Sequence, residues 1–242
     1  MGIEIDRKKV SFCATHNRLV NTSIKTNPTL LVKNGSTISF IYKREKNKTK
    51  RKHATVVPGD GNQLISALKK KKGFRISSRE LNKFVPSFST ILSKTVARKN
   101  YDLIVYIPSR FTIGKVVANR VQRQIPNSRI EHIAFNKSTV EEILNNLQTC
   151  NIEQKDKQSV GAASSRLSQL DRKQYFPLSD IDVSIRKYFI PVSNISTNCT
   201  GEYILIVDDL YATGTTMSNA IDLVRSINPK ATIEGLCLFS PL

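Results

Sequence analysis

Two apolar runs of strand length occupy residues 103–107 and 203–207, and a turn and an amphipathic helix pattern follow each of them. The helix patterns cover residues 113–125 and 215–227, and a last apolar run occupies residues 232–239. Strands without polar alternation are typical of a sheet buried on both faces. This alternation therefore predicts an α/β fold with an open, mainly parallel sheet and helices on both faces.

Weaker patterns lie between these elements. Residues 130–135 and 187–192 are candidate strands, and residues 138–148 form a helix pattern. Ser138 followed by Glu141 indicates a capping box at the start of this helix.

The N-terminal part has signals of its own. Residues 29–44 predict a β-hairpin, because two β-rich runs flank Asn34-Gly35, the dipeptide most typical of tight hairpin turns. Residues 62–72 predict a short helix, and residues 78–99 a second helix that Pro86 divides.

These patterns suggest two regions in the 242-residue chain. Residues 1–55 form a basic N-terminal extension or hood that carries the hairpin, and residues 56–242 form the α/β core. Residues 149–180 are polar and irregular, and a stretch of this length predicts a flexible loop or lid.

The net charge of +19 is concentrated at one end of the chain. Residues 1–100 contain 23 Lys and Arg against 5 Asp and Glu, whereas residues 101–242 are nearly neutral. The densest runs are Lys43–Lys52 and Lys69–Lys72. One interpretation is a solubilising surface. The excess is larger than solubility requires, so we favour a surface that binds nucleic acid, RNA or DNA, through residues 1–100.

Several classes of protein are excluded or disfavoured. The chain has no apolar run long enough for a transmembrane helix and no secretory signal, so we expect a cytoplasmic protein. The four cysteines are scattered and form no C-x-x-C pair, and the three histidines are dispersed. Neither a disulfide framework nor a zinc site is therefore suggested.

The segment that follows residues 203–207 contains the most specific chemistry. The apolar run ends in Asp208 and Asp209, and a hydroxyl-rich turn then enters a helix. That turn comprises Ala212, Thr213, Gly214, Thr215 and Thr216. Ligands of open α/β sheets bind at the carboxyl ends of the strands, and helix N-termini favour phosphate. Two carboxylates beside such a phosphate site suit the hydroxyls of a ribose 5-phosphate.

A P-loop is excluded because no G-x-x-x-x-G-K-[ST] pattern exists. A metal site of the receiver or Walker B type would explain the two acids but not the Thr-Gly-Thr-Thr that follows.

This segment resembles the phosphoribosyl-pyrophosphate (PRPP) signature of type I phosphoribosyltransferases. The resemblance implies that Asp208 and Asp209 hold the ribose hydroxyls, with a Mg²⁺ ion bound through PRPP. It also implies that residues 212–216 bind the 5-phosphate. Ser109 and Arg110 follow the strand at 103–107, where the family binds pyrophosphate, and Arg110 is the expected catalytic cation.

The family also carries a flexible loop that closes over PRPP. Residues 165–173 loosely resemble the corresponding segment of the ComF-like branch, which implies that Arg166, Arg172 or Lys173 meets the departing pyrophosphate.

Three functions fit these observations. The first is a phosphoribosyltransferase associated with nucleic acid, as in retron-like ribonucleoproteins of antiviral defence. The second is a metabolic phosphoribosyltransferase that acts on a small nucleobase. The third is a non-catalytic regulator that binds PRPP and nucleic acid. A protein partner or a homodimer is compatible with each, because dimers are common in the family.

Overall fold

The computed structural model describes residues 1–45 and 62–242. Its centre is a seven-stranded sheet in the order β3-β5-β11-β10-β6-β7, with β4 paired to β5. The strands of this sheet are β3 (Val20–Asn21), β4 (Thr29–Lys33), β5 (Ser36–Arg44), β6 (Leu103–Tyr106), β7 (Arg129–Glu131), β10 (Tyr203–Leu210) and β11 (Thr232–Phe239). The five strands from β5 to β7 are parallel, and only β3 and β4 pair in the antiparallel direction. The expected mainly parallel α/β fold is confirmed.

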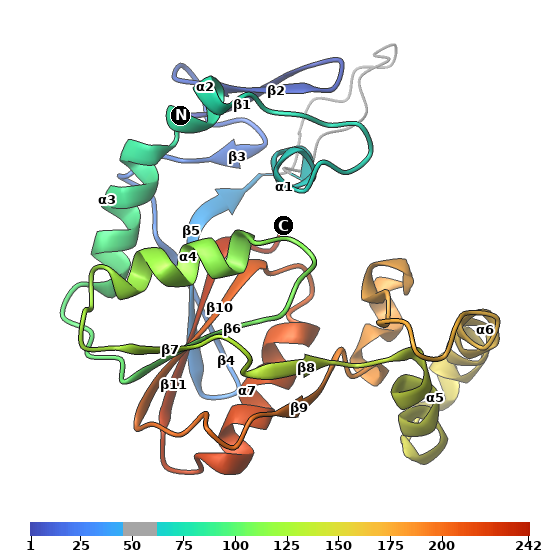
Figure 1. Cartoon of the computed structure of the whole chain (residues 1–242). Coiled ribbons are helices and arrows are strands. Elements are labelled where there is room, and N and C mark those ends of the chain that lie inside the picture. The colour runs from blue at the N-terminus through green and yellow to red at the C-terminus, as the bar shows by residue number, and fades with distance from the viewer. Residues whose placement is uncertain (46–61) are drawn as a thin grey trace.

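Helices cover both faces of this sheet (Figure 1). One face packs against α3 (Val85–Val96) and α4 (Ile113–Gln122), and the other against α7 (Thr215–Ile227). The four residues of α7 at helical spacing are all buried, as the sequence predicts. They are Met217, Ala220, Ile221 and Val224.

The 29–44 hairpin forms as predicted, with Asn34 and Gly35 both at positive φ. Its second strand, β5, pairs in parallel with β11, so the hairpin is also part of the central sheet. Other N-terminal elements lie above the carboxyl edge of the sheet (Figure 1). These are β1 (Gly2–Asp6), β2 (Lys9–Cys13), α1 (Asn62–Leu68) and α2 (Ser78–Asn82). The expected boundary near residue 55 and most of the Lys43–Lys52 run lie outside the described residues.

Residues 78–99 form two helices, α2 and α3, as the proline predicts. Pro86 lies in the first turn of α3, where its missing N–H costs no hydrogen bond.

The largest difference from the sequence prediction is at residues 149–180, which are mainly helical. Residues 138–191 form a helical lobe that contains α5 (Val140–Thr149) and α6 (Lys157–Leu167). It also contains three short 3₁₀ helices: η1 (Gln154–Asp156), η2 (Leu178–Asp180) and η3 (Val183–Tyr188). The candidate strand at 187–192 is therefore wrong except at its last residue, Val192.

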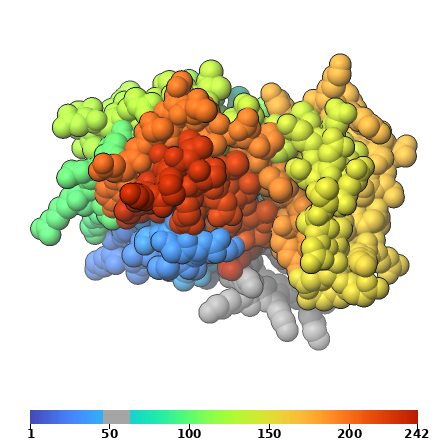
Figure 2. Space-filling model, turned by 90° about the horizontal axis from the view of Figure 1, so that it is seen from below, coloured from blue at the N-terminus to red at the C-terminus, as the bar shows by residue number. Residues whose placement is uncertain are grey.

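The helical lobe has its own hydrophobic core, which explains why it is folded. Eleven buried residues form this core: Val140, Ile143, Leu147, Val160, Ala163, Leu167, Phe176, Ile181, Ile185, Tyr188 and Phe189. The antiparallel pair β8 (Phe135–Lys137) and β9 (Val192–Ile195) connects the lobe to the rest of the molecule. Viewed from below, the lobe stands to one side of the rest of the molecule (Figure 2).

The capping box of α5 is shifted by one residue from the prediction. Thr139 accepts from the backbone N–H of Glu142, whose carboxylate accepts from the N–H of Thr139. Ser138 instead donates its hydroxyl to the carbonyl of Ile190, across the base of the lobe.

Within the described residues, no helix is both long and apolar enough to cross a membrane.

Candidate active site

The two expected carboxylates lie near the end of β10, at the carboxyl edge of the sheet. Successive side chains of a strand point to opposite faces of the sheet. Asp209 therefore lies on the same face as Leu205 and Val207, which is the face covered by α4. Asp208 follows Ile204 and Ile206 to the face covered by α7. The pair therefore presents one carboxylate on each side of the strand.

Asp209 is buried and forms an ion pair with Lys69, which directly follows α1. The Lys69 Nζ lies 2.6 Å from Oδ2 and 2.8 Å from Oδ1 of Asp209. A buried carboxylate needs such a partner, since an unpaired charge in this position would be strongly unfavourable. The pair also fixes the end of α1 over the end of β10.

Asp208 has a different environment. Its Oδ1 accepts a 2.7 Å hydrogen bond from the backbone N–H of Asp209. Burial, followed by the negative charge of Asp209, raises the pKa of Asp208 to about 8. Both effects favour the protonated form of Asp208.

A cluster of cations surrounds this pair of acids. Burial lowers the pKa of Lys137, at the end of β8, and the charges of three neighbouring cations lower it further. These cations are Lys69, Arg110 and Lys71. Asp208 acts on the same pKa in the opposite direction. The convergence of four cations beside Asp208 makes a site for a strongly anionic ligand.

Phe111 organises three of these cations. The Nζ of Lys71 lies 5.3 Å from the centre of the Phe111 ring, and that of Lys69 lies 5.7 Å away. The guanidinium carbon of Arg110 lies 5.5 Å from the same ring. Cations prefer the face of an aromatic ring, so the ring holds the like charges in one region.

The loop from β6 to α4 carries the predicted pyrophosphate residues. The hydroxyl of Ser109 accepts from the backbone N–H of Phe111 and so shapes the turn. Arg110 is exposed, and no side chain caps the N-terminus of α4, which begins after Thr112. The unpaired backbone N–H groups of this helix end are suited to an anion.

The loop from β10 to α7 ends in a second uncapped helix N-terminus. Gly214 lies at the N-cap position with φ of 82°, and no side chain caps α7. A Cβ at this position would lie 2.1 Å from the hydroxyl of buried Tyr211. The hydroxyls of Thr213 and Thr215 lie 3.0 Å apart. Only glycine fits here, and its conformation directs the first N–H groups of α7 toward the carboxyl edge of the sheet.

The remaining predicted site residues lie in the helical lobe. Arg166, on α6, donates to the carbonyl of Ala162, and the Arg172 carbonyl accepts from the N–H of Glu141. Arg166, Arg172 and Lys173 are exposed or nearly so, and among the described residues they have no hydrogen bond or ion pair to residues 208–216. The structure thus brings the acids, Arg110 and the threonine loop to one edge, and leaves these three cations in the lobe.

Sequence reasoning missed Lys69, Lys71, Phe111 and Lys137 as site residues. In the sequence, the run Lys69–Lys72 indicates only a block of positive charge. No local feature distinguishes Lys69, which contacts Asp209, from the three lysines that follow it. Lys137 is a single cation after a weak strand pattern, so only the pairing of β8 with β9 indicates its position.

The fold and the residues at the carboxyl edge of the sheet define the class of protein. It is a parallel α/β protein with a candidate anion site around an acidic pair. Residues 111–241, more than half of the chain, match the model of the phosphoribosyl transferase domain family. The chain belongs to this family. The searches of curated proteins and of solved structures found no match. The matched range begins directly after Arg110, so Lys69 and the N-terminal elements lie outside it.

Proposed function

We propose that this chain transfers the phosphoribosyl group of PRPP to an acceptor and that its N-terminal part binds nucleic acid. The observation that carries the first part is the acidic pair between two uncapped helix N-termini. PRPP has a phosphate at one end and a pyrophosphate at the other, with a ribose diol between them. The N-terminus of α7 suits the 5-phosphate, and the N-terminus of α4 with its cations suits the pyrophosphate.

Asp208 and Asp209 are proposed to accept hydrogen bonds from the ribose hydroxyls. Arg110, with Lys69, Lys71 and Lys137 around it, stabilises the negative charge that develops on the departing pyrophosphate. Positioning and this electrostatic term supply the catalysis, since the transition state asks for little covalent chemistry from the protein.

The residues present fit a Mg²⁺ ion, which the family implies. Carboxylate oxygens are ligands that Mg²⁺ accepts, and Asp208 uses only one of its two oxygens in a hydrogen bond among the described residues. Asp208 and Asp209 would hold the hydrated ion together with PRPP. The ion would neutralise part of the pyrophosphate charge.

Calorimetric titration with PRPP tests the assignment of the acids. Asp208→Asn and Asp209→Asn are expected to abolish binding without unfolding the chain, whereas Asp222→Asn, on the exposed side of α7, leaves binding unchanged. Binding that is unaltered in both site variants contradicts the assignment. Arg110→Ala is expected to lower kcat/KM by about 10²–10³-fold.

The nucleic-acid part of the proposal rests on a basic patch next to this site. The patch consists of Arg7, Lys8, Lys9, Lys70, Lys71, Lys72 and Arg75. These residues lie in two segments, 7–9 and 70–75. Backbone hydrogen bonds join the segments, from Arg75 N–H to the Lys8 carbonyl and from Val10 N–H to the Arg75 carbonyl. Within the part of the chain that the structure describes, none of the seven side chains forms an ion pair with a carboxylate.

The basic patch lies next to the acidic pair. Lys69 contacts Asp209, Lys71 lies over Phe111, and the chain then continues through Lys72 to Arg75. A polyanion bound along the patch would therefore reach the carboxyl edge of the sheet. This favours an acceptor or effector role linked to nucleic acid over a metabolic enzyme for a small free base.

A salt titration of RNA and DNA binding tests this part. Neutralising about six phosphates of a duplex gives a log–log slope near −5. The triple variant Lys8→Glu, Lys72→Glu, Arg75→Glu is expected to lose binding. A control with the same charge change, Lys157→Glu, Lys173→Glu, Lys230→Glu, places the substitutions at exposed positions elsewhere and retains binding. Equal loss in both variants would show a net-charge effect only.

Pyrophosphate release separates the alternatives. Release that depends on RNA or DNA supports the proposal, and release with free bases alone identifies a small-base enzyme. PRPP binding without release under either condition identifies a non-catalytic regulator. The ComF-like relationship and the roles of Arg166 and Arg172 remain proposals, supported by the resemblance of residues 165–173.

A further inference from the structure

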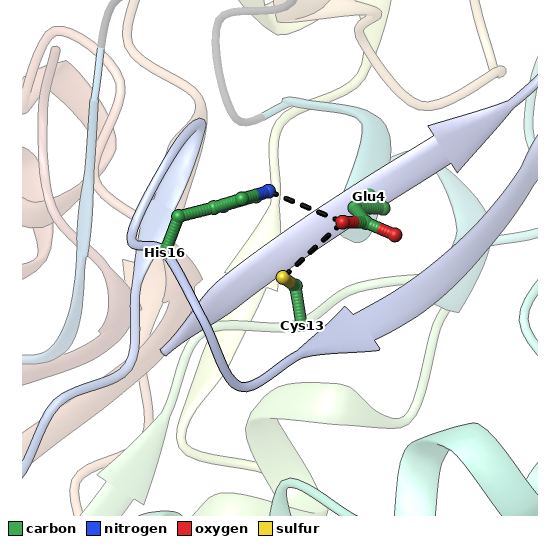
Figure 3. A group of neighbouring side chains, drawn as sticks. All are labelled: Glu4, Cys13 and His16. Carbon is green, nitrogen blue, oxygen red and sulfur yellow. Dashed lines mark hydrogen bonds and ion pairs between the residues drawn. The ribbon is translucent and has the colours of Figure 1, made fainter.

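Three side chains that can bind a metal converge on the hairpin formed by β1 and β2. None of them belongs to the proposed PRPP site. They are Glu4 on β1, Cys13 at the end of β2 and His16 in the loop that follows (Figure 3). The His16 Nε2 and the Cys13 Sγ each lie 3.3 Å from Oε1 of Glu4. All three ligand atoms lie within 4.8 Å of one another.

The strand register explains the convergence. Glu4 pairs with Ser11 across the hairpin, and Cys13 pairs with Gly2. Cys13 is two residues beyond Ser11 and therefore lies on the same face as Glu4, as a diagonal neighbour. His16 returns to this face three residues after Cys13. The sequence spacing is thus C-x-x-H, and the third ligand comes from the partner strand, where spacing along the chain does not reveal it.

These distances fit a tetrahedral ion. Zn²⁺ binds thiolate at about 2.3 Å and imidazole or carboxylate at about 2.0–2.2 Å, which separates neighbouring ligand atoms by about 3.4–3.6 Å. The two separations from Glu4 Oε1, 3.3 Å each, are within a few tenths of an ångström of that range, and His16 Nε2 lies within 4.8 Å of Cys13 Sγ. A set of one sulfur, one nitrogen and one oxygen suits Zn²⁺ better than the hard cations Mg²⁺ and Ca²⁺.

We propose that Glu4, Cys13 and His16 bind one Zn²⁺ ion, with water in the fourth position. The Glu4 side chain is 61% exposed, so solvent reaches this position. The ion would join β1, β2 and the loop after β2. Phe12 on the same hairpin donates its N–H to Glu80 of α2, and its ring lies 5.0 Å from that of Phe84. The ion would therefore stabilise the hairpin that carries part of the basic patch.

The proton balance of binding is defined. Zn²⁺ replaces the thiol proton of Cys13, which is released to solvent. In the metal-free protein, Nδ1 of His16 accepts a 3.3 Å hydrogen bond from the exposed N–H of Arg18. Coordination of the ion through Nε2 requires the ring proton on Nδ1 and therefore breaks that contact. About one proton per ion is therefore released near neutral pH.

The experiment uses the full chain after chelation and removal of the chelator. Titration with Zn²⁺ is expected to give one equivalent of binding and release of about one proton, measured by calorimetry in buffers of different ionisation enthalpy. Co²⁺ in place of Zn²⁺ is expected to give tetrahedral d–d bands and a thiolate charge-transfer band.

Matched variants locate the ion. Cys13→Ser is expected to remove the charge-transfer band, and His16→Gln and Glu4→Gln to weaken Zn²⁺ binding by more than about tenfold, since even indirect ligand contacts cost that much. Cys150→Ser, in the lobe, should bind as the unaltered protein does. If Cys13→Ser does not fold, the exposed Glu4→Gln and half-buried His16→Gln carry the test. No stoichiometric binding, or binding that these variants leave unchanged, overturns the proposal.

Discussion

Lys69 and Asp209 are 140 positions apart in the chain and form an ion pair at the carboxyl edge of the sheet. The contact joins the N-terminal α1 region, outside the matched family range, to the acidic pair within it. Only 17% of the Lys69 side chain and 6% of that of Asp209 are exposed. The site is therefore built by both parts of the chain.

Lys69→Met should lower the free energy of unfolding by about 3 kcal/mol, because it leaves the buried carboxylate of Asp209 without its partner. Lys115→Met, an exposed lysine of α4, serves as the control and should change stability little. Denaturant unfolding of both variants gives the comparison. In the double variant Lys69→Met, Asp209→Asn the loss should be smaller than the sum of the single losses. Additive losses would show that the pair does not couple in solution.

PRPP binding should depend on pH through Asp208, whose pKa is raised to about 8. The ionised carboxylate can accept hydrogen bonds from ribose hydroxyls with both oxygens, whereas in the protonated form one oxygen becomes a donor and the negative charge is lost. Affinity should therefore rise by up to about tenfold per pH unit between pH 6 and pH 8 and then level off. The binding constant measured across this range checks it, and a flat profile for the unaltered protein would refute the role of the group.

The same group makes stability depend on pH in the opposite direction. The folded pKa lies above the ordinary value of 3.8, so the folded state holds more protons between these two values. The free energy of unfolding should fall as pH rises from about 4 to about 8. Asp208→Asn, which cannot ionise, should reduce this fall in thermal unfolding scans over the same pH range.

The sequence predicted the central elements because their physics is local. The apolar runs of β6 and β10 are buried on both faces, and the inward residues of α7 follow the helical period. The Asn34-Gly35 turn was equally readable, because few residues other than Asn and Gly adopt its positive φ angles. The position of Asp208 and Asp209 at the strand end follows from the same pattern.

The helical lobe could not be read in this way. On α6 only Val160, Ala163 and Leu167 are buried, and Gly161 lies within the helix. Small residues and a glycine give a weak helical pattern, and the helix is stable because its buried side joins the lobe core. Likewise, two overlapping S/T-x-x-E patterns start at Ser138 and Thr139, and only the contact with Ile190 decides which one caps α5.

Gly214→Ala should disrupt the phosphate loop, because the new Cβ would lie 2.1 Å from the Tyr211 hydroxyl and φ is 82°. We expect PRPP affinity to fall by more than about tenfold, with a loss of more than about 1 kcal/mol in stability. Gly161→Ala is the matched control, since no atom lies within 4 Å of its added Cβ. In α6 this change should leave PRPP binding intact and stabilise the protein by about 0.5–1 kcal/mol. Unaltered PRPP binding in Gly214→Ala would contradict the proposed phosphate role of the loop.

Glu234, near the start of β11, offers a test that separates stability from PRPP binding. Its carboxylate accepts from Lys99 Nζ at 2.6 Å and from Tyr203 Oη at 2.9 Å, and it also accepts from the hydroxyl of Tyr101. The register places Leu205 opposite Glu234 and Asp208 opposite Cys237, so this cluster lies toward the amino edge of the sheet, away from the acidic pair.

Burial raises the pKa of Glu234, but the hydrogen bonds from Lys99, Tyr101 and Tyr203 outweigh it, and the net pKa is lowered. A lowered carboxyl pKa contributes stability that is present above the ordinary value and lost as pH falls through the folded value. Glu234→Gln should therefore cost about 2 kcal/mol at pH 7, which lowers the Tm by about 4–8 °C in a chain of this size. The difference from the unaltered protein should shrink below pH 4, while PRPP affinity at 25 °C stays the same. A variant with an unchanged Tm at pH 7, or with a difference that persists in acid, would show that the charged network does not brace this edge of the sheet.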